Sequence, residues 1–148
     1  EIEISGHGMF YGQHSCRINS KGQLYLYNNN HQVGDTSRSN ISSVAIFKEP
    51  VYSTDTLEKL WEFNCDIDTL TSSFTIGGGS VEELKTQDII VCMAFGRNFI
   101  VSKSHQVLWD SIIEEAIESN KWKVYQQGYR SYMIESINKL TELILNDK

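Results

Sequence analysis

The sequence predicts an α+β fold, in which an antiparallel, curved sheet is packed against one short helix and two C-terminal helices. Short segments of the first half alternate apolar and polar residues, as strands with one buried face do. Apolar residues then recur at helical spacing over most of the last 44 residues. The chain has 148 residues, 40% of them hydrophobic, and shows no internal repeat. Residues 1–148 are therefore expected to form a single domain with one core.

The first strands are expected at residues 9–18 and 24–27, both rich in β-forming side chains. Between them, residues 19–22 read Asn-Ser-Lys-Gly, which favours a hairpin because Asn and Gly accept a positive φ. A further strand is expected at 44–47. Residues 28–40 carry almost no apolar side chain, so they are expected to form an exposed loop.

The middle of the chain is expected to alternate between helix and strand. Residues 55–64 are predicted to be helical, because Leu57, Leu60 and Trp61 fall on one face at 100° per residue. A strand is predicted at 69–76. Residues 80–83 read Ser-Val-Glu-Glu, a capping box that favours a short helix.

The most apolar run of the chain covers residues 89–95 and is expected to be a central strand. It is predicted to turn at Gly96-Arg97-Asn98 into a second strand at 99–101, forming a hairpin.

Two helices are predicted after residue 104. The first has an apolar stripe of six residues: Leu108, Trp109, Ile112, Ile113, Ala116 and Ile117. Trp61 and Trp109 are both expected to be buried against the sheet. The second helix is predicted at about 129–146, with Ile134 and Leu145 outside its core stripe. These two residues suggest a homodimer through the C-terminal helix, or a structural or assembly subunit.

Negative charge is concentrated in residues 49–88, which hold nine acids and two bases. This stretch carries −7, whereas the whole chain carries −6, so the remainder sums to +1. A field of one sign favours partners of opposite charge and repels nucleic acid. The expected function is therefore that of a small acidic, non-enzymatic protein, similar in its physics to an immunity protein, which engages and inhibits a basic protein.

The partner-binding residues are expected on an acidic helix face and the segment after it. They are Asp55, Glu58, Glu62, Asp66 and Asp68. The competing interpretation is a solvated helix face that only keeps the protein soluble.

The alternative function is a small hydrolase or a phosphate-binding domain that uses His7, His14 and the Gly77–Gly79 loop. Backbone N–H groups at a glycine-rich helix start can bind phosphate. The chain contains no known phosphate-loop or nucleophile motif, so no catalytic residue is expected. His7, His14 and Cys16 have no clear fourth ligand, so no metal or other cofactor is expected.

Three cysteines make an odd set, which favours reduced thiols and a cytoplasmic location. No apolar stretch is long enough to cross a membrane as a helix, and the first residues do not resemble a signal peptide. Residues 121–130 carry three bases among aromatic residues, a footprint too small to favour nucleic acid as a partner.

Overall fold

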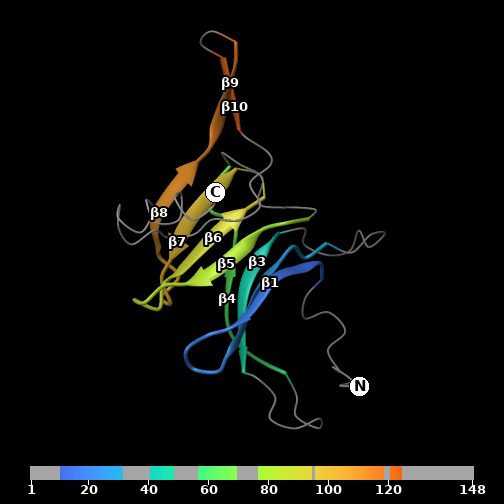
Figure 1. Ribbon diagram of the computed structural model, residues 1–148, viewed down its shortest axis with the longest axis vertical. Coiled ribbons are helices and arrows are strands. Elements are labelled where there is room, and N and C mark those ends of the chain that lie inside the picture. The colour runs from blue at the N-terminus through green and yellow to red at the C-terminus, as the bar shows by residue number, and fades with distance from the viewer. Residues whose placement is uncertain are drawn as a thin grey trace, which may run out of the picture.

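The structure is a computed structural model in which two four-stranded antiparallel sheets pack face to face beside a two-stranded ribbon (Figure 1). It describes residues 11–31, 41–48, 57–69, 77–94, 96–118 and 121–124. The predicted α+β fold is wrong for this part of the chain, because the described residues form strands and no helix.

Sheet A contains β1 (Gln13–Ile18), β2 (Leu24–Asn28), β3 (Ser43–Lys48) and β4 (Glu58–Asn64), side by side in chain order. The predicted β1–β2 hairpin is confirmed. Its turn closes with hydrogen bonds from the Asn19 amide to the Gln23 carbonyl and from the Gly22 amide to the Asn19 carbonyl. The φ of Gly22 is 74°, which is the conformation for which glycine was expected there.

Sheet B contains β5 (Ser80–Glu83), β6 (Ile89–Met93), β7 (Arg97–Val101) and β8 (Val107–Ile112), again in chain order. The predicted central strand is confirmed as β6, which is buried along its whole length and pairs on both sides. The hairpin into β7 is also confirmed, but Arg97 and Asn98, which were predicted to lie in its turn, belong to β7. The ribbon of β9 (Glu114–Glu118) and β10 (Lys121–Val124) projects away from the sheets, at the top of Figure 1.

The main core lies between the two sheets and is built from alternate residues of both. Sheet A contributes four buried side chains, with Trp61 and Phe63 packed against them, and sheet B contributes six. The buried members from the sheets are Tyr25, Tyr27, Val44, Ile46, Val81, Ile89, Val91, Met93, Phe99 and Val101. Alternation with period two therefore sets the inner face of each sheet.

The helix predicted at 55–64 is wrong, because residues 58–64 form β4. Trp61 pairs with Ile46 while Lys59 pairs with Phe47, so Leu60 is an extra residue in a β-bulge. Leu57 packs against the cluster of Leu26, Ala45 and Phe47, Trp61 packs against the main core, and Leu60 is exposed. Their helical spacing in the sequence therefore does not mark one buried face.

The other two described segments that were predicted to be helical are also strands. In β5, Val81 is buried and pairs with Val91, so the apparent capping box is coincidental. In β8, Leu108 occupies a second bulge, and Trp109 is 48% exposed. The expected burial of Trp109 is therefore wrong, because this residue of β8 keeps about half of its surface in solvent. Trp61 is partly buried against the core.

The exposed loop predicted at 28–40 is wrong at its start. Asn28 and Asn29 are fully buried. The Asn28 side-chain oxygen accepts hydrogen bonds from the Tyr11 and Asn30 amides, and the Asn29 side chain donates to the Gly78 carbonyl. Buried amides pair in this way because an unpaired polar group in a core is costly.

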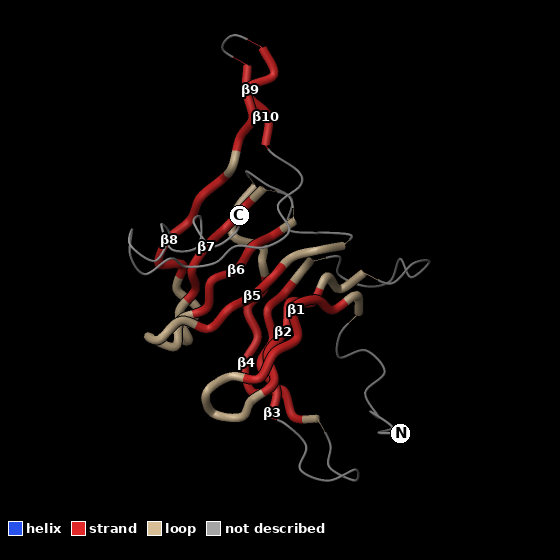
Figure 2. Tube along the Cα trace, in the orientation of Figure 1, coloured by secondary structure: helices blue, strands red, loops and turns tan. Residues whose placement is uncertain are grey.

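Several predictions fall on residues outside the described ranges. They concern the helix at 129–146 with Ile134 and Leu145, the strand at 69–76 beyond Thr69, and the histidine His7. No helix in the described part of the chain is long and apolar enough to cross a membrane. Figure 2 traces the strands and the loops between them.

Candidate functional site: the acidic end of the sandwich

One buried arginine holds two aspartates at the edge of the main core. Arg97 donates two hydrogen bonds to Asp68, at 2.7 and 2.8 Å, and two to Asp110, at 2.9 and 2.5 Å. The guanidinium side chain is 2% exposed, whereas each carboxylate keeps about a third of its surface in water. We call Arg97, Asp68 and Asp110 the arginine clamp.

Strand register brings the arginine clamp together. Arg97 begins β7 on the inner face, opposite Met93 and Ile112, and Asp110 is paired with the inward-facing Phe99. Asp68 comes from the segment after β4, which belongs to sheet A. The clamp therefore ties the two sheets together, and its planar guanidinium suits two bidentate carboxylates.

The arginine clamp is negative overall. Its hydrogen bonds to Asp68, and then to Asp110, raise the pKa of Arg97 above its usual range, so the guanidinium remains charged. Two carboxylates against one guanidinium leave the clamp at −1. Asp66, two residues before Asp68 in the chain, is exposed, and with it the four residues sum to −2. We call Asp66 and the clamp together the acidic end.

The structure does not bring together the four predicted partner-binding residues that it describes. Asp66 and Asp68 lie at the acidic end. Glu58 lies at the start of β4, and the acidic end follows Asn64 at the other end of this strand. At about 3.3 Å per residue, the two ends of β4 are roughly 20 Å apart. Asp55 lies outside the described residues.

Glu58 and Glu62 each have a basic neighbour. The side chain of Glu58 lies 3.8 Å from Lys48, and both are exposed. Glu62 pairs with Lys59 and accepts a hydrogen bond from the Ser43 hydroxyl. Their negative charge is therefore partly neutralised within the chain, and they do not form one helix face.

The alternative site is partly assembled, because His14 meets the glycine loop. The Gly78 amide donates to His14 Nε2 at 3.2 Å. That amide is therefore already engaged by the protein's own histidine and is not aimed at a ligand. Gly79 lies against the buried ring of Tyr27. Among the described residues no group of three potential metal ligands forms.

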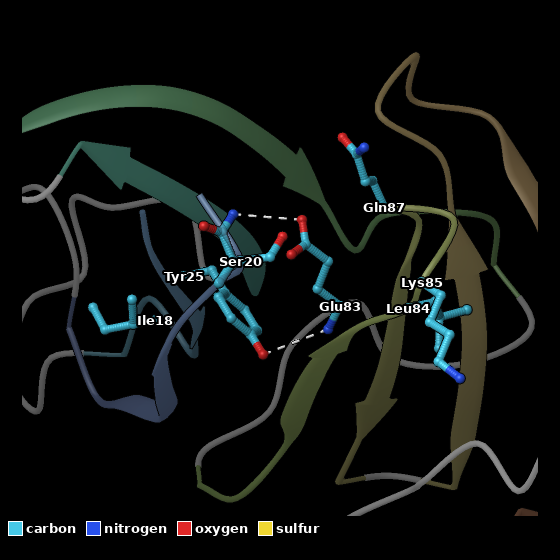
Figure 3. Close-up of a pocket in the computed structure, with 8 residues that line it drawn as sticks. Ile18, Ser20, Tyr25, Glu83, Leu84, Lys85 and Gln87 are labelled. Carbon is cyan, nitrogen blue, oxygen red and sulfur yellow. Dashed lines mark hydrogen bonds between the residues drawn. The ribbon is translucent and has the colours of Figure 1, made fainter. Parts of the chain in front are cut away.

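A polar pocket of about 450 Å³ lies between the β1–β2 turn and the start of the β5–β6 turn (Figure 3). Glu83 is its most buried charged group, with a side chain 8% exposed. The side-chain amide of Asn19 donates to the Glu83 carboxylate at 3.4 Å, and Lys103 Nζ lies 3.5 Å from the same carboxylate. The Tyr25 hydroxyl accepts from the Glu83 backbone amide. The Glu83 carboxylate is therefore paired with Lys103 of the same chain.

Trp61 makes a set of contacts that sequence analysis did not predict. Its indole N–H donates to the Lys103 carbonyl at 3.0 Å, and Lys103 Nζ lies 5.4 Å from the ring centroid. The His105 ring stacks on the indole with centroids 5.2 Å apart. Burial lowers the pKa of Lys103, and the nearby Glu83 opposes that effect.

Neither Cys16 nor Cys65 is an activated nucleophile. Burial raises the pKa of the Cys65 thiol, and partial burial raises that of Cys16. A raised pKa leaves less thiolate at neutral pH, and the thiolate is the reactive form.

Sequence analysis found Asp66 and Asp68 but missed Arg97 and Asp110. One signal was present, because Arg97 lies between two strongly apolar runs. A buried arginine is expected to pair with carboxylates. The identity of those carboxylates depends on the strand register, which local spacing does not give.

No protein-family model, curated protein or solved structure matches this chain.

Proposed function

We propose that this protein is a non-enzymatic binding protein that engages a basic protein partner through its acidic end. The observation that supports the proposal is the arginine clamp. Arg97 fixes two carboxylates in place and leaves them one-third exposed, next to the exposed Asp66.

Fixed carboxylates suit recognition of a basic partner. A carboxylate that is already held by hydrogen bonds loses less conformational entropy when a lysine or arginine of a partner approaches. The net charge of −2 carried by the residues of the acidic end is part of the −6 of the whole chain, and a negative field of this kind steers a basic partner during diffusion. We further propose inhibition of that partner, and a cytoplasmic location in which Cys16, Cys65 and Cys92 remain thiols.

The hydrolase or phosphate-binding alternative has weaker support. Its glycine-loop amide and His14 are hydrogen-bonded to each other. The acidic end has exposed carboxylate surface that a partner can reach.

The test begins by capturing a binding protein from the native host and measuring its association rate against ionic strength. We expect Asp66→Lys to slow association by about three- to tenfold, and the wild-type rate to fall with salt, as steered association does. Glu58→Lys is the matched control, since it makes the same charge change on the far end of β4 and is expected to have a smaller effect.

The stability of Asp66→Lys should stay close to that of the wild type, because Asp66 is exposed. An association rate that responds neither to salt nor to Asp66→Lys would contradict the proposal. An equal effect of both variants would assign the binding to overall charge and not to the acidic end.

A further inference from the structure

The polar pocket between the β1–β2 turn and the start of the β5–β6 turn has the size of a small-ligand site. Its volume is about 450 Å³, and its walls come from strands of both sheets. Pockets that bind small molecules have volumes of about 300–1,000 Å³. The pocket opens to solvent, because the lining residues Ser20, Lys85 and Gln87 are exposed. A small ligand can therefore enter it.

Glu83 presents a carboxylate oxygen without a partner to this pocket. Its side chain is 8% exposed. Oε1 accepts from the Asn19 side-chain amide at 3.4 Å and lies 3.5 Å from Lys103 Nζ. Oε2 has no hydrogen bond or ion pair among the described residues, and it is not fully buried. Figure 3 shows the carboxylate directed toward the β1–β2 turn, where Ser20 lies. An oxygen held in this way favours a hydrogen-bond donor from a ligand.

Donor groups without an acceptor line the same pocket. The Tyr25 hydroxyl accepts from the Glu83 backbone amide, but its own proton has no acceptor among the described residues. The Gln87 side-chain oxygen accepts from Lys21 Nζ at 2.6 Å, and the N–H donors of that amide are unused in the described part of the chain. The Ser20 hydroxyl has no hydrogen bond there either, and it can donate or accept. The pocket therefore offers an acceptor and several donors together.

The charges at the pocket favour a neutral ligand. Lys103 already pairs with Glu83, so a cationic ligand would compete with an ammonium group of the same chain. An anionic ligand would meet the Glu83 carboxylate. An ammonium group only donates and a carboxylate only accepts, whereas a hydroxyl group does both. Neighbouring hydroxyls of one ligand can therefore satisfy the Glu83 oxygen and the donors of Tyr25 and Gln87 at once.

We propose that this pocket binds a neutral polyhydroxylated ligand of one-ring size, either a sugar residue or a cyclic polyol. One hydroxyl of the ligand donates to Glu83 Oε2, and a neighbouring hydroxyl accepts from Tyr25. Ile18 and Leu84 also line the pocket and offer apolar contact to the ring carbons of the ligand.

The pocket and the acidic end are separate sites. Glu83 pairs with Ile89 at the start of β6, whereas Arg97 pairs with Met93 at the end of β6. The two sites therefore lie at opposite ends of this strand, and either proposal can fail alone.

The test is an NMR titration of the isotope-labelled full-length protein, followed at the backbone amide of Glu83. The probes are myo-inositol and the methyl glycosides of glucose, galactose and mannose. We expect at least one probe to give a saturable shift with a dissociation constant of about 10 mM or below. Methylammonium and acetate at matched ionic strength are the controls. Neither is expected to give a saturable shift, because each offers only donors or only acceptors.

The ranking of the probes distinguishes the two sources of the ligand. Tighter binding of a methyl glycoside supports a sugar residue of a glycan, because the methyl group stands in for the next residue. Tighter binding of myo-inositol supports a free cyclic polyol.

Substitutions assign the binding to the pocket. Tyr25→Phe is expected to weaken it about two- to tenfold, because one neutral hydrogen bond is lost. Tyr27→Phe is the matched control, since it makes the same change two residues along β2, outside the pocket, and is expected to leave binding unchanged. Glu83→Gln is expected to weaken binding at least about tenfold, because a charged acceptor makes the stronger hydrogen bond. Tyr25→Phe keeps the Glu83–Lys103 pair, so it tests the site even if Glu83→Gln does not fold.

The proposal is overturned if none of the four polyols gives a saturable shift, or if Tyr25→Phe binds them as tightly as the wild type does. It is also overturned if methylammonium or acetate binds more tightly than the polyols, because the pocket would then recognise charge.

Discussion

At the residue scale, Gly79 is a position with no room for a side chain. Its φ is 99°, and a Cβ there would lie 2.4 Å from Cε1 of Tyr27, whose ring is fully buried. Sequence analysis interpreted residues 77–79 as a flexible or phosphate-binding loop. The structure gives Gly79 a steric role instead, because only glycine lets the backbone approach the ring this closely.

Gly79→Ala is expected to lower the free energy of unfolding by about 2–4 kcal/mol, combining backbone strain with overpacking. Gly22→Ala is the control. Its φ is also positive, at 74°, but no atom lies within 4 Å of the added Cβ, so only the strain of about 1–2 kcal/mol is expected. Urea unfolding of both variants measures the difference, and equal losses would show that the Tyr27 contact does not matter.

At the element scale, a bulge in each of β4 and β8 helps to explain why these two strands were predicted as helices. A regular strand places the residues of one face two apart, but the extra residue at Leu60 or Leu108 lengthens one such step to three. Local spacing cannot distinguish a bulged strand from an amphipathic helix. Strands without a bulge beside a strong apolar run, such as β2, β3 and β6, were predicted correctly.

The arginine clamp is the contact at this scale that joins the segment after β4 to β7 and β8. Arg97→Met should lower the free energy of unfolding by about 3 kcal/mol, because it leaves Asp68 and Asp110 facing each other without a cation. Lys48→Met is the control, since the exposed Lys48–Glu58 pair is expected to contribute at most about 1 kcal/mol.

Adding Asp110→Asn to Arg97→Met should recover part of the loss, because the change removes one of the two opposed charges. Chemical denaturation of the single and double variants measures this coupling. Strict additivity of the two substitutions would mean that the clamp does not act as a unit.

At the scale of the whole molecule, the two sheets share one core. The main core contains buried side chains from β2 and β3 of sheet A and from β5, β6 and β7 of sheet B. Neither inner face can keep its apolar side chains out of water without the other. The described strands of both sheets are therefore expected to unfold together.

Native-state hydrogen exchange tests this expectation. Amides of β3 and β6 should exchange with the same free energy of opening, and Val91→Ala in sheet B should lower both values equally, by about 1–3 kcal/mol. A variant that lowers the protection of β6 while leaving that of β3 unchanged would show that the sheets open separately.

The sequence by itself determined the local features: the β1–β2 hairpin from its Asn and Gly, the buried β6 from its apolar run, and the concentration of acids in residues 49–88. These depend on residues near one another in the chain. Only the tertiary structure decided that Asp68 and Asp110 meet at Arg97, that Gly79 lies on Tyr27, and that Trp61 is covered while Trp109 is exposed. Each of these depends on strand register and on which sheet face is covered, and both are set by contacts between residues far apart in the sequence.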